Sequence, residues 1–310
     1  MSIELIERPS VVADRRRFIG GSDVAAILGI SPWKTPLQLW NDKTQPAMPE
    51  TDAARLRVLN RGKRMEPYIL DMIRDEHGVN VIAANERYTD QAVDYFACEI
   101  DAEAKDEKRG HINIEIKTVH PFKVKEWGDI GTDALPLHYL AQVQWGLGIT
   151  GRQYCDVYAL IGDDLKRYAV EADGELIATL REKAIQFWVR YVSALTPPPP
   201  VSEEDLYMLY PADNGQAAPI DSDADALSAL NELRALRIEA KELDARIEGC
   251  EKALKTRMGD VAMLTVGGTK VCTWKSKQAK RFDQKAFAAA HPALFEQFIK
   301  TSESRVFRLA

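Results

Sequence analysis

One segment in the middle of the chain carries the side chains that hydrolysis of a phosphodiester requires. Residues 111–118 read HINIEIKT, in which three isoleucines alternate with polar residues. Side chains along a strand point alternately to opposite faces. The isoleucines are therefore expected to face a core, and the opposite face is expected to carry Asn113, Glu115 and Lys117.

The preceding segment supplies a second carboxylate. The strand-like stretch FACEIDAEA contains Asp101, and residues 106–110 (DEKRG) have the composition of a turn. If the two strands pair as a hairpin, Asp101 lies close to Glu115.

Two carboxylates and an ammonium group on one sheet surface suit metal-assisted hydrolysis. Asp101 and Glu115 offer hard oxygen ligands for Mg²⁺, and the backbone carbonyl of Ile116 with waters would complete an octahedron. Lys117 would orient or deprotonate the attacking water, or stabilise developing charge. The alternative is an exposed strand face with a cross-strand salt bridge, because Glu-x-Lys is common on amphipathic strands.

Two other segments place polar side chains among apolar ones. In residues 60–70 (NRGKRMEPYIL), Glu66 shares a helix face with apolar residues and is either a rim residue or a third acid directed into the site. In residues 139–145 (YLAQVQW), Gln142 and Gln144 lie in a helix with a buried pattern. Buried amides need partners, which here are a DNA phosphate, a metal-bound water or ordinary core groups.

Three arginines at positions 15–17 precede a short predicted helix over residues 22–29. Ser22 is expected to be its N-cap, and Gly29 to end it. Helix N-termini and guanidinium groups both bind phosphate, so this segment is a candidate pocket for a terminal phosphate. Taken alone, it is a capped helix beside a solvated charge run.

The coarse pattern of the first two hundred residues mixes helices and strands, which predicts an α/β (α+β) fold with a mixed sheet. The predicted helices are 22–29, 52–77, 134–149 and 173–194, and the predicted strands are 79–84, 94–104, 111–119, 154–161 and 165–171.

Composition divides the chain into three parts. Four prolines at 197–200 and a Pro/Asp-rich stretch after them indicate a linker. We expect a first domain at 1–196, a linker at 197–222 and a C-terminal module at 223–310.

The C-terminal module begins with a heptad pattern, which predicts a helical arm or an oligomer contact. Its apolar positions recur at alternating spacings of 3 and 4: Leu233, Leu236, Ala240, Leu243, Ile247, Cys250 and Leu254. A short β segment around Gly267-Gly268 and a last helix over 283–300 are expected to follow.

The charge is uneven along the chain. The net charge of −6 argues mildly against a nucleic-acid binder. However, residues 252–310 hold twelve basic and four acidic side chains, a balance of +8 that leaves −14 for residues 1–251. Lys275 and Lys277, next to Trp274, suit phosphate tracking beside an aromatic platform, and the alternative is a solvated basic face.

The sequence lacks the features of membrane proteins, secreted proteins and cysteine-based metal sites. No apolar run approaches the roughly 20 residues that span a bilayer, and the N-terminus lacks a signal-peptide core, so no membrane partner is expected. The four cysteines (98, 155, 250 and 272) lack the spacing of a zinc or iron–sulfur site and are expected to be reduced thiols in a cytoplasmic protein.

Five segments, taken in order, resemble the phage-type exonuclease family related to lambda exonuclease, also called the YqaJ-like viral recombinase family, within the PD-(D/E)xK nuclease superfamily. They are RRRFIGGSDVAAILGISPW, NRGKRMEPYI, Asp101, Glu115-Ile116-Lys117 and YLAQVQWGLGITG, and the resemblance covers about residues 12–195. Glu-x-Lys alone is a weak signal, whereas this ordered set is specific.

The resemblance implies a restriction-endonuclease-like core, a mixed sheet flanked by helices, and a role for each matching residue. Asp101 and Glu115 would bind Mg²⁺ (or Mn²⁺), and Lys117 would serve the nucleophilic water. Glu66 would be a helix-borne acid beside the metal, and Gln142 would support the site.

Other matching positions concern the substrate. Arg15 and Ser22 match those that hold the 5′-phosphate, and we also assign Gln144 to DNA binding. One departure from the superfamily is that its Pro-Asp-Gly element reads Ile100-Asp101-Ala102 here. The turn after the aspartate must therefore differ, and Glu99 or Glu103 is an alternative ligand.

The implied activity is 5′→3′ digestion of one strand of linear double-stranded DNA in phage or prophage recombination. The resulting 3′ overhang would be used by a single-strand annealing protein. Lambda exonuclease is a trimeric ring, so a homo-oligomer is expected. Related enzymes bind iron–sulfur clusters through a set of four ligating cysteines. The cysteines of this chain do not form such a set, so no cluster is expected. Alternatives are a phage-type endonuclease on the same fold and a non-catalytic DNA-binding or assembly protein.

Overall fold

A computed structural model describes residues 15–46, 52–301 and 304–309, and it divides the chain into two compact units at Leu209. Each unit is described separately below. The first holds the central sheet with its helices, and the second begins at Tyr210.

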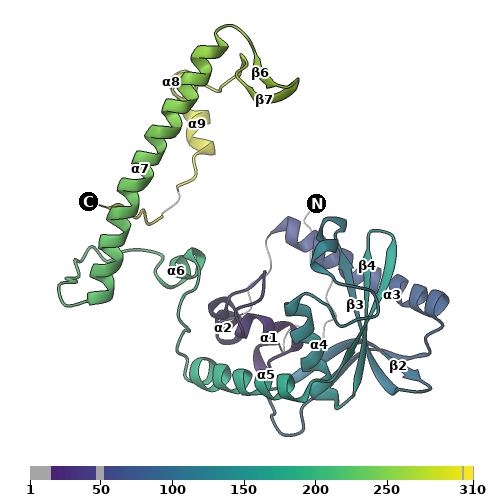
Figure 1. The fold of residues 1–310 in the computed structure, drawn as a ribbon. Helices are drawn as coiled ribbons and strands as arrows, with labels where there is room; N and C mark the ends of the chain where they lie inside the picture. Colours follow the sequence, from purple (N-terminus) through teal and green to yellow (C-terminus); the bar gives the residue numbers. More distant parts are fainter. Residues whose placement is uncertain (1–14, 47–51, 302–303, 310) are drawn as a thin grey trace. The chain divides into compact units, whose positions relative to one another are not determined.

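A five-stranded mixed sheet forms the centre of the first unit (Figure 1). Its strands lie in chain order: β1 (Val81–Thr89), β2 (Ala97–Asp106), β3 (Gly110–Val119), β4 (Tyr154–Ile161) and β5 (Asp164–Glu171). Only β3 and β4 are parallel, and α4 (Leu137–Thr150) connects them, since parallel neighbours need a crossover. The predicted α/β class with a mixed sheet is confirmed.

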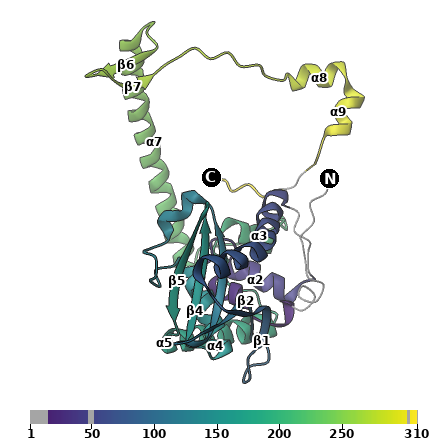
Figure 2. The same ribbon diagram turned by 90° about the vertical axis from the view of Figure 1, so that its right-hand side faces the viewer.

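Helices cover both faces of this sheet (Figure 2). On one face, α3 (Ala53–His77) packs Ile69, Leu70 and Ile73 against the three isoleucines of β3. The other face is covered by α4 together with α1 (Gly21–Ile27), α2 (Pro36–Thr44) and α5 (Gly174–Phe187). The isoleucines of the HINIEIKT segment therefore face a core, as predicted.

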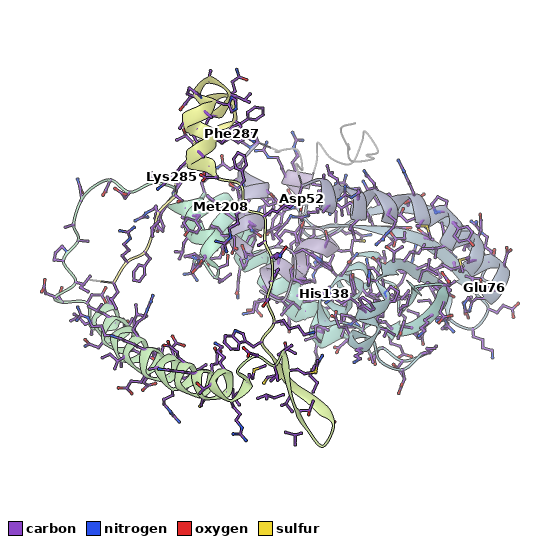
Figure 3. The ribbon with its side chains drawn as sticks, turned by 90° about the horizontal axis from the view of Figure 1, so that it is seen from above. Asp52, Glu76, His138, Met208, Lys285 and Phe287 are labelled. Carbon is purple, nitrogen blue, oxygen red and sulfur yellow. The ribbon has the colours of Figure 1, made fainter. Side chains whose placement is uncertain are left out.

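The boundaries of α3 agree with the sequence, whereas the start of α1 does not. Asp52 caps the start of α3, and Gly78 ends it in the left-handed conformation at φ 61° (Figure 3 labels Asp52 and, near the other end, Glu76). The expectation that Ser22 caps α1 is wrong, because the N-cap is Gly20. The carboxylate of Asp23, at the third helical position, instead accepts the N–H of the N-cap residue Gly20 at 3.0 Å.

The first unit extends beyond the boundary expected after residue 196. A short helix, α6 (Glu203–Leu209), lies in the stretch that the composition assigned to the linker. Its buried Asp205 accepts hydrogen bonds from the Thr35 hydroxyl at 2.6 Å and the Val201 N–H at 2.9 Å. These contacts attach α6 to α2.

The second unit contains one long helix and several short elements. They are α7 (Ala224–Met258), the hairpin of β6 (Met263–Val266) and β7 (Thr269–Thr273), α8 (Gln284–Ala290) and α9 (Pro292–Phe298). The single helix expected over 283–300 is wrong. The helical region is disfavoured for the residue before a proline, and His291, which precedes Pro292, has φ −135° and ψ 60°.

Among the helices that the structure describes, none combines the length and the apolar character needed to cross a bilayer.

The packing of α4 on α5 depends on Gly148. A Cβ at this position would lie 2.7 Å from Cγ2 of Ile177, a β-branched side chain that has little freedom to move. We expect Gly148→Ala to lower the free energy of unfolding by about 1–3 kcal/mol, measured by urea unfolding with tryptophan fluorescence. Gly174→Ala is the control, because its Cβ would meet nothing within 4 Å. Equal stability of the two variants would contradict this account.

Candidate functional site

The polar face of β3 lies beneath α4. Asn113 donates to the Thr150 hydroxyl of α4 at 3.2 Å, and Glu115 accepts a hydrogen bond from Gln142 of the same helix at 2.6 Å. Glu115 is only 6% exposed. The face is therefore a covered interior surface, and the alternative of an exposed strand face with a salt bridge is wrong.

The pairing of β2 with β3 is interrupted at Asp101. The last regular pair is Ala102 with Ile114. Beyond it, the backbone N–H of Ile116 donates to Oδ2 of Asp101 at 2.7 Å. A side-chain carboxylate thus replaces a strand carbonyl as the acceptor, and the two strands diverge without leaving this N–H unpaired.

Strand β2 also changes its inward face at Asp101. Ile100 packs into the core under α1 and α4, whereas Ala102 packs into the core under α3. Residues two apart on a regular strand share a face, so the backbone is irregular between them. Asn85 of β1, which lies between the partners of Ile100 and Ala102, has φ 60°. This irregularity directs the Asp101 side chain towards β3.

Glu115, Lys117 and Gln142 form a hydrogen-bonded triangle. Lys117 Nζ donates to Glu115 Oε1 at 2.5 Å and lies 3.3 Å from Gln142 Oε1. The amide nitrogen of Gln142 donates to the same oxygen of Glu115 at 2.6 Å. Gly21 allows α1 to approach here, because a Cβ on it would lie 3.1 Å from Gln142 Cγ.

The charges in this cluster act on one another. Burial, and then the negative charge of Glu115, raises the pKa of Asp101 well above its usual value, and Glu66 adds a smaller effect in the same direction. Burial opposes the ammonium form of Lys117, but the charges of Glu115 and Asp101 outweigh it and raise the pKa of Lys117. The carboxylates and the lysine thus behave as one interacting set.

Glu66 approaches this set from α3, on the opposite face of the sheet from α4. Glu66 is half-buried. Helix α3 passes close to the end of β3 at Gly62, where an added Cβ would lie 3.8 Å from the Thr118 hydroxyl. The structure therefore brings Glu66 within electrostatic range of Asp101.

An aromatic group that the sequence analysis missed lies beside Lys117. The ring of Tyr139 is centred 5.0 Å from Lys117 Nζ, and Trp33 and Trp127 lie against Tyr139 at 5.8 and 5.6 Å between centroids. His138, labelled in Figure 3, contacts Trp33 edge-on. Tyr139 precedes Gln142 by three residues, so the helical repeat itself places them on one face.

The N-terminal segment forms a second polar cluster. Arg15 donates from Nη2 to the Ser22 hydroxyl at 2.8 Å, and both residues are exposed. Beneath them, buried Lys43 donates to the carbonyls of Arg15 and Phe18 at 2.7 and 2.6 Å and to Asp23 at 2.7 Å. Burial would raise the pKa of Asp23, but Lys43, Arg15 and the Gly20 N–H together outweigh it and lower that pKa. No sequence signal distinguished Lys43 from a surface lysine.

Gln144 does not join the site. It is 3% exposed, its amide nitrogen donates to the Glu171 carbonyl at 2.7 Å, and its oxygen accepts the Asp173 N–H at 2.9 Å. Both ends of the amide thus connect α4 to the segment before α5. Gln144 is two residues from Gln142 along α4, so its side chain leaves the helix on a different side, towards Glu171 and Asp173.

The alternative metal ligands Glu99 and Glu103 do not join the site. Glu99 is exposed, and Glu103 forms a buried ion pair with Arg152 at 2.7 Å. Lys275 and Lys277, the candidate DNA contacts, belong to the second unit and are exposed. Asp101 and Glu115 are the carboxylates at the strand divergence, and within the described ranges no group of three or more His, Cys, Asp or Glu side chains is arranged to hold a metal ion.

The fold and the site define an α/β protein whose mixed sheet carries an aspartate–glutamate–lysine centre beneath its crossover helix. Residues 12–153 match the YqaJ-like viral recombinase domain, which confirms the resemblance seen in the sequence. The chain is homologous to the protein YqaJ of Bacillus subtilis (strain 168): the two are 27% identical over 97% of this chain and 94% of that protein.

Two solved structures are also similar to this chain. The alkaline exonuclease LHK-Exo from Laribacter hongkongensis is 21% identical, with a TM-score of 0.45 over 64% of this chain and 94% of that one. A phage related exonuclease from Haemophilus somnus 129PT is 13% identical, with a TM-score of 0.38 over 58% and 96% of the two chains.

The buried Lys43–Asp23 pair should matter for stability. Lys43→Met leaves a buried carboxylate without its ammonium partner, so we expect a loss of about 3–5 kcal/mol in urea unfolding, partly recovered in Lys43→Met/Asp23→Asn. The control is Lys34→Met, which breaks the exposed Lys34–Asp42 pair and should cost at most about 1 kcal/mol. Equal losses in Lys43→Met and Lys34→Met would refute the assignment.

Proposed function

We propose that this chain is a metal-dependent deoxyribonuclease that digests linear double-stranded DNA from its ends during phage or prophage recombination. The observation that carries the proposal is the convergence of Asp101, Glu115 and Lys117 where β2 and β3 diverge. The match of residues 12–153 to a viral recombinase domain agrees with it.

The donor set suits Mg²⁺, with Mn²⁺ as the alternative. Asp101 and Glu115 provide carboxylate oxygens, and their charges, with that of Glu66, exceed the single ammonium of Lys117. The N–H and C=O of one strand residue point to the same edge, so the Ile116 carbonyl shares the edge at which its N–H meets Asp101. When bound, Mg²⁺ supplies charge neutralisation at the phosphoryl group and makes a water more acidic.

The protein groups then have distinct tasks. The ammonium group of Lys117 lies next to the Glu115 carboxylate. It would orient the attacking water or stabilise charge on the phosphoryl oxygens. Gln142 holds Glu115 and Lys117 in position through its two amide atoms, since a site built on packed elements needs its side chains fixed.

Arg15 and Ser22 are proposed to bind the terminal 5′-phosphate. Their side chains are already in contact and exposed, and Arg15 has further donors for a bidentate contact with phosphate. Digestion from a phosphorylated 5′ end would leave a 3′ overhang for a single-strand annealing protein. The reaction would then take place in the cytoplasm of a bacterial host, in a homo-oligomer such as a trimeric ring.

Activity and end dependence can be measured together. Purified protein with Mg²⁺ should degrade end-labelled linear duplex and leave covalently closed circles intact. Glu115→Gln and Lys117→Ala should each lower the rate by about 10²-fold or more, because each removes a group from the reacting centre. Glu99→Gln, which changes an exposed carboxylate on the same strand as Asp101, is the control and should retain the rate.

Three other results would each change the conclusion. Cleavage of closed circles would support an endonuclease. Binding of DNA without turnover under any divalent metal would support a non-catalytic protein. Full activity in Glu115→Gln or Lys117→Ala would show that the site lies elsewhere.

The phosphate pocket has its own signature. Arg15→Ala should slow digestion of 5′-phosphorylated ends by about tenfold or more and leave digestion of 5′-hydroxyl ends unchanged, because a charge-assisted contact is lost only where the phosphate exists. Arg17→Ala removes the same charge from an exposed neighbouring position and is the control. If both kinds of end slow equally in Arg15→Ala, the pocket is not a 5′-phosphate site.

The basic segment after β7 is proposed to contact DNA phosphates through Lys275 and Lys277. Lys275→Gln/Lys277→Gln should reduce the slope of log affinity against log salt by about 0.9 for each lost phosphate contact. Arg234→Gln/Lys241→Gln, on α7, removes the same charge and serves as the comparison. Identical slopes for the two double variants would assign the effect to net charge alone.

A further inference from the structure

Helix α7 (Figure 1) exposes an apolar stripe that no other described element of the second unit covers. Leu236, Leu243, Ile247 and Leu254 are each 48–53% exposed along this 35-residue helix. They recur at the a and d positions of a heptad, the narrow seam through which helices pair. A stripe of half-exposed leucines at this spacing is typical of a helix that has a partner.

The neighbouring hairpin leaves this seam open. Trp274, directly after β7, lies near Glu248, Lys252 and Lys255 of α7, which occupy b and f positions on the outer side of the helix. Trp274 therefore lies on the polar side of α7, and the a and d side chains remain exposed.

We propose that α7 pairs with α7 of a second copy of this chain as an antiparallel two-stranded coiled coil centred between Lys241 and Glu242. The complementarity of side-chain size and charge along the helix identifies the occupant, the direction and the register.

Size is the first argument. In this register, each a side chain meets a d side chain of the other copy, and every small residue meets a larger one. The layers are Ala229 with Leu254, Leu233 with Cys250, Leu236 with Ile247, and Ala240 with Leu243. A parallel pair in register would instead place Ala240 against Ala240 and Cys250 against Cys250, which leaves two layers underfilled, and interiors are close-packed.

Charge is the second argument. In an antiparallel pair, e positions flank e positions and g positions flank g positions. The register above places Arg237 beside Asp244 at e and Glu239 beside Arg246 at g, and two-fold symmetry repeats each contact. All four of these contacts join opposite charges.

Other arrangements bring like charges together. A shift of one heptad in one direction places Arg237 against Arg237 and Glu239 against Glu239, and a shift in the other direction does the same for Asp244 and Arg246. A parallel pair joins Glu232 to Arg237 and Arg246 to Glu251, but it places Glu239 of one copy beside Asp244 of the other. Like charges at such positions destabilise a pair, so the charge pattern favours the antiparallel register, in which these flanking contacts join only opposite charges.

Cysteine crosslinking of the full-length chain tests the direction and the register. Cys98 and Cys155 are buried, and Cys272→Ser leaves Cys250 as the exposed thiol. In that background, Leu233→Cys should give a disulfide-linked dimer under mild oxidation, since residues 233 and 250 face each other across the seam. Cys250 without the substitution faces Leu233 and should not crosslink. Ala245→Cys/Cys250→Ser, on the outer face, measures random collision.

The crosslinking outcomes separate the possible occupants. A dimer formed through Cys250 alone would show a parallel pair and overturn the proposal. No crosslink above the collision control in Leu233→Cys would show that α7 does not pair with a second α7. Because the readout concerns α7 alone, either result is independent of the proposed nuclease activity and of any association through the first unit.

Charge substitution provides a second test that leaves the seam intact. Asp244→Arg places two arginines together at each e contact of the antiparallel pair and should weaken self-association about tenfold in sedimentation equilibrium. Arg237→Asp/Asp244→Arg exchanges the charges and should restore it, with helix content checked by circular dichroism. Stronger association in Asp244→Arg would refute the antiparallel pair, because that substitution relieves the Glu239–Asp244 repulsion of a parallel one.

Discussion

The hydrogen bond from the Ile116 N–H to the Asp101 carboxylate is the contact on which the site depends. In a continuous sheet, this N–H would donate to a strand carbonyl, and β2 and β3 would remain paired past the site. With a side chain as the acceptor, the strands diverge while the buried N–H keeps a partner. Asp101 is thereby held near Glu115, and the edge between the strands is free of further pairing.

Helix α4 covers the site that the divergence of β2 and β3 opens. It is the crossover that parallel pairing of β3 and β4 requires, so the topology itself places a helix over the polar face of β3. Gln142 donates to Glu115 through its nitrogen and faces the Lys117 ammonium with its oxygen, because one amide carries both a donor and an acceptor. The charges are thus held in a covered space, where their mutual effect is stronger than in water.

The sequence predicted what local rules control. The alternation in HINIEIKT located the core face of β3, and Gly78 marked the end of α3, because both follow from backbone geometry. It did not predict features that depend on tertiary contacts. Asp23 accepts the Gly20 N–H and pairs with Lys43 from a different helix, and Gln144 bonds to the backbone of Glu171 and Asp173 rather than to the site. Pro292 was a local signal for the break between α8 and α9 that the helical pattern around it obscured.

The distribution of charge gives a further reason for an antiparallel arrangement of α7. Residues 252–310, which begin in the last turns of α7, carry a balance of +8. A parallel pair would bring two such segments together at one end. In the antiparallel register, the two Met258 residues are about 50 Å apart at 1.5 Å per helical residue, several times the screening length at physiological salt. The same charges that would oppose a parallel pair then carry little electrostatic cost and remain available to an anionic ligand at each end.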